Sequence, residues 1–278
     1  MSQPAASPLL PTIAFIGGGN MASAIIGGLI HQGHPASQIE VVEPWAEARE
    51  ALRKNYGIEA QAEAGPALQR AQIVVWAVKP QTFKDAAAQA KAHTQGALHL
   101  SVAAGIRSDS IAQWLGTERI VRTMPNTPAL VGKGMSALYA RPAVSAPERQ
   151  SIEAIMATTG EFLWVDSEPQ LDAVTALSGS GPAYVFYFLE AMTRAGTGMG
   201  LTEQQAHQLA VGTFVGASEL ARRSDDPPPV LRQRVTSKGG TTYAALQSME
   251  AAGVAASFEA AMRAAQHRAH ELGDEFGA

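Results

Sequence analysis

The sequence predicts an α/β domain with a doubly wound parallel sheet, followed by an all-α domain. Up to about residue 166, short apolar runs alternate with segments rich in helix formers, and this alternation is typical of strand–helix–strand units. A glycine-rich turn follows the first apolar run directly, as in nucleotide-binding sheets. Beyond residue 166 the strand pattern fades and Ala, Leu, Met and Glu dominate. We therefore expect a flexible tail at 1–11, an α/β domain at 12–166 and a helical domain at 167–278.

The α/β part contains apolar runs that predict strands. The early runs are continuous rather than alternating, which indicates parallel strands covered on both faces. The predicted strands are 13–16, 39–42, 73–78, 98–102, 120–123, 135–139 and 162–165. Helices are predicted between them at 22–31, 46–55 and 83–93.

The second part predicts helices at 182–200, 202–223, 241–252 and from 254 to the C-terminus. Three consecutive prolines, 227–229, interrupt this pattern and predict a turn after the second of these helices. In the first of them, residues 184–189 are apolar on more than one side. Such a helix must be buried on several sides, so we expect the helical domain to form a homodimer.

Composition excludes several classes of protein. The chain has 278 residues, 46% of them hydrophobic and 17% charged, so it can bury a sizeable core. Its net charge of −4 argues against a nucleic-acid partner. The absence of cysteine excludes disulfides and thiolate metal sites, and it favours a cytoplasmic protein. The longest apolar run, 183–189, is too short to span a membrane, and the proline-rich start carries no Lys or Arg and does not resemble a signal peptide.

The glycine-rich turn predicts a dinucleotide site in a Rossmann-like domain. Gly17 permits a tight turn, Gly19 lets a pyrophosphate approach the backbone, and Ala22 allows close packing of helix on strand. Glu43 ends the second predicted strand, 21 residues after Ala22, where a carboxylate binds the ribose in such sites. The alternative is a turn that serves packing alone. The residues predicted here to bind the cofactor are Ile16, Gly17, Gly18, Gly19, Asn20, Met21 and Glu43.

Two further strand ends are candidates for the same crevice, because ligands bind at the carboxyl ends of parallel strands. One carries Val78, Lys79 and Pro80, although Lys79 can equally remain solvated. The other carries Ala103 and Ala104, whose small side chains leave room for a flat ring or serve packing.

Several longer motifs occur in order along the chain. They are Met-Pro-Asn-Thr-Pro at 124–128, Leu-Ser-Gly-Ser-Gly-Pro-Ala-Tyr at 177–184 and Ser-Lys-Gly-Gly-Thr-Thr at 237–242. With the glycine turn, they make the chain resemble pyrroline-5-carboxylate reductase over residues 12–275. The resemblance implies reduction of a cyclic imine to L-proline with NADPH or NADH as cofactor, by a homodimer or a larger assembly such as a homodecamer. It also implies that Asn126 binds the cofactor, and that the substrate, pyrroline-5-carboxylate, is bound by Ser178, Ser180, Ser237, Gly239, Gly240, Thr241 and Thr242.

The predicted substrate loop suits the chemistry of that reaction. Paired glycines at the start of a helix let backbone N–H groups surround an anion, such as the substrate carboxylate. Thr242 is the predicted catalytic residue, which hydrogen-bonds the ring nitrogen; the alternative is that it caps the helix. Lys238 departs from the family, which usually has proline there, and this puts the substrate affinity in doubt.

Other interpretations remain open from the sequence. A hydroxyacid or prephenate-type dehydrogenase also joins a Rossmann-like domain to helices, but we find no motif for its catalytic Lys or His. A non-catalytic redox sensor would bind dinucleotide without needing the substrate loop. His267 and His270 lie three residues apart but are expected to be solvated, and we expect no metal. Glu43 favours NADH, whereas Arg49, or a Trp45 that turns Glu43 outward, would favour NADPH.

Overall fold

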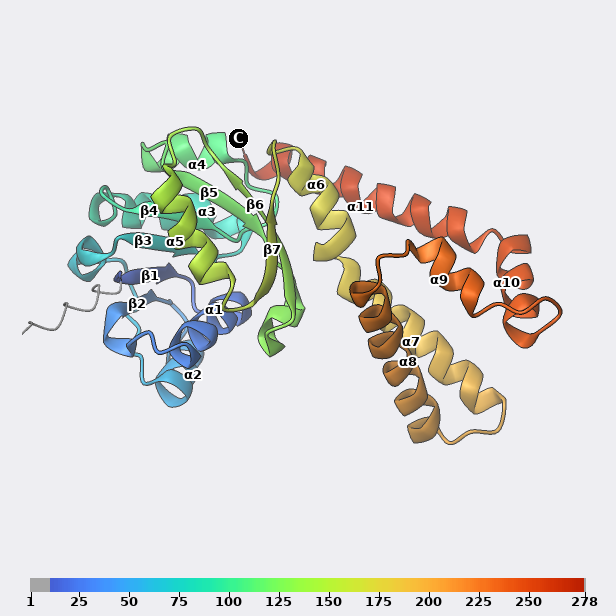
Figure 1. The fold of residues 1–278 in the computed structure, drawn as a ribbon. Coiled ribbons are helices and arrows are strands. Elements are labelled where there is room, and N and C mark those ends of the chain that lie inside the picture. Colours follow the sequence, from blue (N-terminus) through green and yellow to red (C-terminus); the bar gives the residue numbers. More distant parts are fainter. Residues whose placement is uncertain (1–10, 278) are drawn as a thin grey trace, which may run out of the picture. The chain divides into compact units, whose positions relative to one another are not determined.

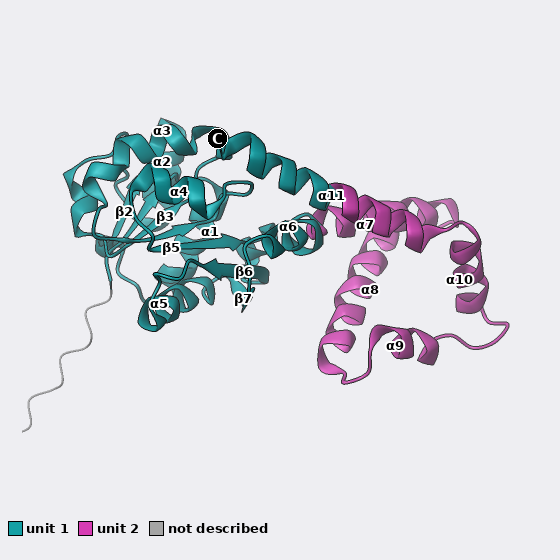
Figure 2. Ribbon diagram, turned by 90° about the horizontal axis from the view of Figure 1, so that it is seen from above, with its two compact units in different colours: residues 1–180, 265–278 teal, residues 181–264 magenta. Residues whose placement is uncertain are grey.

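The computed structural model describes residues 11–277, so the predicted tail lies outside the described residues except for Pro11. The backbone forms two compact units (Figure 2). Unit 1 comprises residues 1–180 and 265–278, and unit 2 comprises residues 181–264. The domain boundaries predicted from the sequence, at residues 11 and 166, stay predictions.

Unit 1 is built on a seven-stranded sheet with the order β2-β1-β3-β4-β5-β6-β7 (Figure 1). The strands are β1 Ile13–Ile16, β2 Ile39–Val42, β3 Ile73–Trp76, β4 Leu98–Ser101, β5 Ile120–Met124, β6 Gly134–Ala140 and β7 Gly160–Trp164. Neighbouring strands are parallel except β5 and β6, which are antiparallel. β2 and β3 lie on opposite sides of β1, so the strand order reverses there, and ligands bind at such a point in open α/β sheets.

Helices cover both faces of this sheet. They are α1 Asn20–His31, α2 Ala46–Tyr56, α3 Pro80–Ala90, α4 Ser108–Leu115, α5 Ala146–Met156 and α6 Gln170–Val174. Short 3₁₀ turns join them: η1 Ala36–Gln38, η2 Pro66–Arg70, η3 Lys91–His93 and η4 Thr127–Val131.

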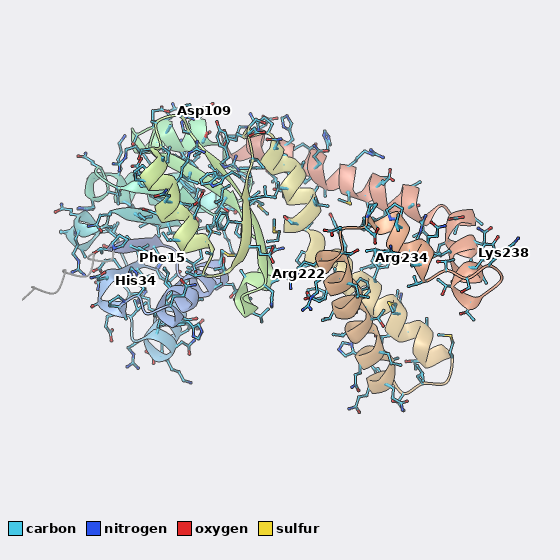
Figure 3. All side chains as sticks on the ribbon, in the orientation of Figure 1. Phe15, His34, Asp109, Arg222, Arg234 and Lys238 are labelled. Atoms are coloured by element: carbon cyan, nitrogen blue, oxygen red, sulfur yellow. The ribbon has the colours of Figure 1, made fainter. Side chains whose placement is uncertain are left out.

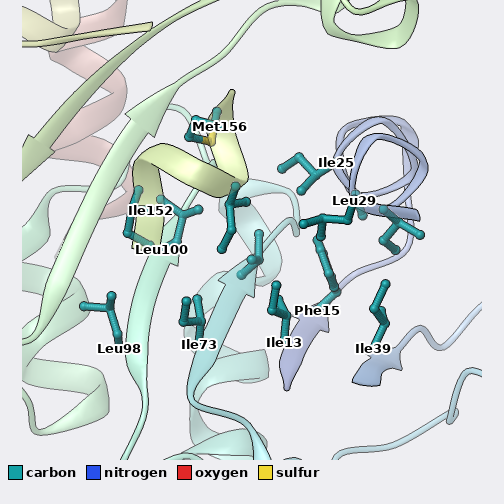
Figure 4. Close-up of a cluster of buried hydrophobic side chains, with 14 of the residues drawn as sticks. Ile13, Phe15, Ile25, Leu29, Ile39, Ile73, Leu98, Leu100, Ile152 and Met156 are labelled. Carbon is teal, nitrogen blue, oxygen red and sulfur yellow. The ribbon is translucent and has the colours of Figure 1, made fainter. Parts of the chain in front are cut away.

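The core has two parts because side chains alternate across each strand. Ile13 and Phe15 of β1 face the layer of α1, α2 and α5 (Figure 4), whereas Ala14 and Ile16 face the layer of α3 and α4. All four are buried, which explains why the first strand reads as a continuous apolar run. The predicted doubly wound sheet is confirmed.

Three helices of unit 1 were not predicted from the sequence, namely α4, α5 and the short α6. α4 is eight residues long, and α5 begins after Ser145. A signal for α5 was present, since Ser145 and Glu148 form a capping box in which each side chain bonds the other's backbone N–H. The predicted strands 73–78 and 98–102 end earlier, at Trp76 and Ser101.

Unit 2 consists of helices alone. They are α7 Gly181–Gly198, α8 Glu203–Arg223, α9 Pro228–Arg234, α10 Thr241–Ala251 and the first part of α11 Val254–Phe276. The predicted helical half is confirmed, but the proline run does more than end α8. Pro227 is the N-cap of α9, and Pro228 and Pro229 occupy its first two positions, where a missing backbone N–H costs no hydrogen bond.

The apolar stretch in α7 divides between two surroundings. Tyr184 and Phe188 pack edge-on against Phe258 of α11, with ring centroids 5.5 Å and 5.8 Å apart. Phe186 and Tyr187 are instead 63% and 66% exposed. Unit 2 therefore covers one side of α7 only in part and leaves the other side exposed. No helix of the described part of the chain has the length and apolarity needed to cross a membrane.

Candidate active site

The turn after β1 is shaped by its glycines. Gly17 has φ +96°, and a Cβ there would lie 2.5 Å from the carbonyl oxygen of Ala77, just beyond the end of β3. A side chain is therefore excluded by both backbone conformation and space. Gly19 is the N-cap of α1 and offers no side-chain acceptor, and nothing lies within 4 Å of where its Cβ would be. The turn thus leaves open space beside the N-terminus of α1, where an anion is favoured.

A cavity of about 650 Å³ lies at the carboxyl ends of β1, β2 and β3. Of the predicted cofactor residues, it is lined by Ile16, Gly17, Gly19, Glu43, Val78 and Lys79. Gly18, Asn20, Met21, Pro80, Ala103, Ala104 and Asn126 are not among its lining residues. The sequence did not single out Glu47, Thr82 and Asp85, which also line it. These three lie early in α2 and α3, so their proximity to strand ends was the available signal.

Glu43 is held firmly in this cavity. Its side chain is only 5% exposed, and its two carboxylate oxygens accept hydrogen bonds from the backbone N–H groups of Gly18, at 2.7 Å, and Trp45, at 2.9 Å. The suggestion that Trp45 turns Glu43 outward is therefore wrong. Trp45 itself is 75% exposed and lines the cavity.

The two nearby cations are placed differently. Arg49 donates from Nη1 to the carbonyl oxygens of Glu43, at 2.9 Å, and Pro44, at 2.7 Å, and it does not line the cavity. Lys79 lines the cavity at the N-terminus of α3, and its ammonium has no ion-pair partner among residues 11–277. The cavity therefore offers a phosphate one ammonium group, that of Lys79, and the N-terminus of α1.

Asn126 joins three segments of unit 1. Its side-chain N–H donates to the carbonyl oxygen of Ser178 at 3.0 Å, and its side-chain oxygen accepts from the N–H of Met135 at 2.9 Å. Ser178 belongs to η5 Thr175–Gly179, a π-helical turn that separates α6 from α7. The structure thus brings together Asn126 and Ser178, which the resemblance assigned to cofactor and substrate. Such π-helical turns are frequent at functional sites.

The predicted substrate loop, which contains Lys238 (Figure 3), lies in unit 2. Gly239 has φ +76°, and the N–H of Gly240 donates to the carbonyl oxygen of Ser237 at 3.0 Å, closing a tight turn before α10. The N-cap of α10 is Gly240, so the alternative that Thr242 caps this helix is wrong. Thr241 and Thr242 are exposed in its first turn. The turn therefore presents hydroxyls and first-turn N–H groups without a capping side chain.

The two C-terminal histidines bond different partners. His267 lies 3.2 Å from the Glu271 carboxylate, and His270 lies 3.3 Å from that of Asp172. No group of three or more potential metal ligands is found among the described residues.

The glycine turn at the strand switch, the adjoining cavity and the buried carboxylate at the end of β2 define a dinucleotide-binding oxidoreductase fold. Residues 12–105 match the family described as NADP oxidoreductase coenzyme F420-dependent, and residues 168–272 match pyrroline-5-carboxylate reductase dimerisation. The chain is 45% identical to pyrroline-5-carboxylate reductase of Pseudomonas aeruginosa, over 96% of this chain and 98% of that protein. The chain belongs to the pyrroline-5-carboxylate reductase family.

Solved structures agree with this assignment. A pyrroline-5-carboxylate reductase from Coxiella burnetii has a TM-score of 0.87 and 37% identity, covering 95% of this chain and 98% of that one. The Plasmodium falciparum enzyme, solved with NADP bound, has a TM-score of 0.85 and 27% identity, with the same coverage. Prephenate dehydrogenase of Aquifex aeolicus shares the fold alone, with 11% identity and a TM-score of 0.53 over 87% of this chain and 96% of that one.

Proposed function

We propose that this protein reduces pyrroline-5-carboxylate to L-proline with NADPH or NADH, the last step of proline biosynthesis. The observation that carries the proposal is the match to pyrroline-5-carboxylate reductases. The match spans both units of this chain and covers 98% of the length of the Pseudomonas aeruginosa and Coxiella burnetii proteins. The dehydrogenase alternative has only a shared fold in its favour. The redox-sensor alternative gives no role to the substrate loop, whose residues Gly240, Thr241 and Thr242 are all present in this chain.

The residues of unit 1 fit a dinucleotide. The open space beside Gly19 suits a pyrophosphate, and the cavity beyond it suits the adenosine half of the cofactor. When bound, the nicotinamide supplies a hydride. We assign cofactor binding to the predicted residues at this turn and at the ends of β2 and β3, with Asn126 supporting the site through its bond to Ser178.

The chemistry asks little of a catalytic acid. The substrate is a five-membered imine ring with one carboxylate; a hydride is added at the imine carbon and a proton at the nitrogen, which gives proline. Because the imine can arrive protonated, the chain needs a carboxylate site and a hydrogen-bonding group at the nitrogen. We assign the carboxylate to the first-turn N–H groups of α10 and the loop 237–241, and the nitrogen to the Thr242 hydroxyl.

We further infer that the protein is a dimer built through unit 2. Large apolar side chains are exposed on α7 and α8, the two longest helices that lie wholly within unit 2. Among them are Phe186 and Tyr187 on α7 and Leu209 and Leu220 on α8. Exposed apolar patches of this kind mark interfaces, and this segment matches the dimerisation family. Assembly into a homodecamer and a cytoplasmic location are parts of the same proposal.

The test is a reductase assay with a product measurement. The purified protein is mixed with pyrroline-5-carboxylate and either NADH or NADPH, the nicotinamide absorbance is followed, and proline is quantified by amino-acid analysis. We expect one proline for each reduced cofactor consumed. Binding of dinucleotide without proline formation would favour the sensor, and consumption of the cofactor only with a hydroxyacid or prephenate-type substrate would favour the dehydrogenase.

A further inference from the structure

Glu43 occupies the position at which dinucleotide-binding sheets place the carboxylate that binds the adenosine ribose. It directly follows β2 and lines the cavity, and two backbone N–H groups fix its carboxylate at 2.7 Å and 2.9 Å. A carboxylate has about four acceptor positions, so the two bonds leave capacity for ribose hydroxyls. The donors are backbone groups of Gly18 and Trp45. The carboxylate therefore cannot rotate away without breaking its hydrogen bond to the glycine-rich turn after β1.

The charges around this carboxylate are mostly negative. Glu47 and Asp85 also line the cavity, and Lys79 is its single lining cation among the described residues. Arg49, the nearest guanidinium in sequence, is bonded through Nη1 to the carbonyl oxygens of Glu43 and Pro44 and is absent from the lining. An NADP site ordinarily uses an arginine to accommodate the 2′-phosphate, and this cavity presents none.

The two cofactors differ at this one point. The ribose of NADH presents hydroxyls, which donate to a carboxylate; the 2′-phosphate of NADPH presents negatively charged oxygens, which a carboxylate repels. Repulsion between the carboxylate and a phosphate a few ångströms away in a partly shielded cavity corresponds to binding of NADPH that is about 10-fold to 100-fold weaker than binding of NADH.

We propose that this chain selects NADH over NADPH, and that the buried Glu43 carboxylate is the residue that determines the choice. The proposal rests on the proposed function for its physiological meaning, but the selection is a property of the adenosine pocket alone. It therefore holds or fails independently of which substrate is reduced.

Binding gives a test that needs no turnover. Trp45 lines the cavity and is 75% exposed, so its fluorescence reports a bound adenine ring. The probes are adenosine 5′-monophosphate and adenosine 2′,5′-bisphosphate, titrated into the full-length protein. We expect the monophosphate to bind at least about 10-fold more tightly. Equal binding, or tighter binding of the bisphosphate, would overturn the proposal on the unmodified protein alone.

A variant then assigns the effect to its residue. Glu43→Gln removes the charge and keeps the size, and Glu50→Gln, on an exposed part of α2 outside the cavity, is the matched control. We expect Glu43→Gln to bring the ratio of the two affinities, and the ratio of kcat/KM for NADH and NADPH, close to one. We compare ratios because any weakening of the glycine-rich turn by the substitution affects the binding of both ligands equally. A ratio in Glu43→Gln that remains at the natural value would place the selection elsewhere and refute the proposal.

The two proposals fail in distinguishable ways. If the protein makes no proline with either cofactor but binds the monophosphate preferentially, the selection stands and the proposed function falls. If it makes proline with NADPH as efficiently as with NADH, the function stands and the selection falls.

Discussion

Buried His99 makes the stability of unit 1 depend on pH. It lies on β4 with 1% of its surface exposed, and its Nδ1 accepts a hydrogen bond from Trp76 Nε1 at 3.0 Å. A further hydrogen bond joins the ring to the backbone of Thr94. Burial, helped by the nearby charge of Arg119, lowers the pKa of His99 from 6.5 to about 4. The folded protein therefore holds this imidazole neutral at neutral pH.

The sign and size of the effect follow from the two pKa values. Between a pH of about 6.5 and a pH of about 4, the unfolded chain binds a proton at His99 and the folded chain does not, so acid favours unfolding. The stabilisation is complete above pH 6.5 and is lost as the pH falls toward 4. At about 1.4 kcal/mol per pKa unit the whole effect is about 3 kcal/mol, and about 2 kcal/mol is lost between about pH 7.5 and about pH 5.

The assay is urea unfolding at those two pH values, at one fixed protein concentration because assembly contributes to stability. His99→Gln offers an amide oxygen to Trp76 and an N–H group to Thr94 but does not titrate. His267→Gln, on an exposed part of α11, is the control. We expect the natural protein to lose about 2 kcal/mol more than His99→Gln on acidification. An equal loss of unfolding free energy in the natural protein and in His99→Gln would refute the argument. His34, whose pKa is also lowered by burial, is present in both proteins and contributes equally to each.

Three further predictions concern the site and the assembly. Thr242→Ala should lower kcat by roughly 10²-fold, while Thr242→Ser retains most of it; normal turnover of Thr242→Ala in the reductase assay would remove the hydroxyl from catalysis. Gly17→Ala should lower the melting temperature of the cofactor-free protein, because its Cβ would meet the Ala77 carbonyl at 2.5 Å. Gly19→Ala should weaken dinucleotide binding and lower the melting temperature less, because its Cβ meets no other atom and only the N-cap of α1 is weakened. Phe186→Asp should produce monomers in light scattering, and a natural protein that is already monomeric at micromolar concentration would contradict the dimer.

The sequence predicted elements well where burial alone determines them. Strands such as Ile73–Trp76 are buried on both faces, so an unbroken apolar run was enough to find them. The antiparallel direction of β6 had no such signal, because direction depends on how the connection crosses the sheet. α9 was missed because its prolines were interpreted only as a helix end, although proline suits a helix start equally well.

The candidate site shows the same division. Gly17 and Glu43 were placed in one crevice from spacing alone, because strand ends converge at the point where the strand order reverses. The bond from Gly18 to Glu43 depends on the exact path of a loop and could not be predicted. For Asn126, the resemblance implied a role at the cofactor but carried no indication of its bonds to Met135 and Ser178.

The path of α11 has a consequence for the order in which the chain is made. The helix begins in unit 2 and ends in unit 1, where Leu272 fills the space beside Gly105, Asp274 pairs with Arg107 at 2.5 Å and Phe276 packs against the core layer of α3 and α4. Residues 265–278 leave the ribosome after all of unit 2, although they belong to the unit whose sheet was synthesised first. The N-terminal unit is therefore the last to be completed, and a ribosome stalled after residue 264 should hold a protease-sensitive sheet beside a fully synthesised helical unit.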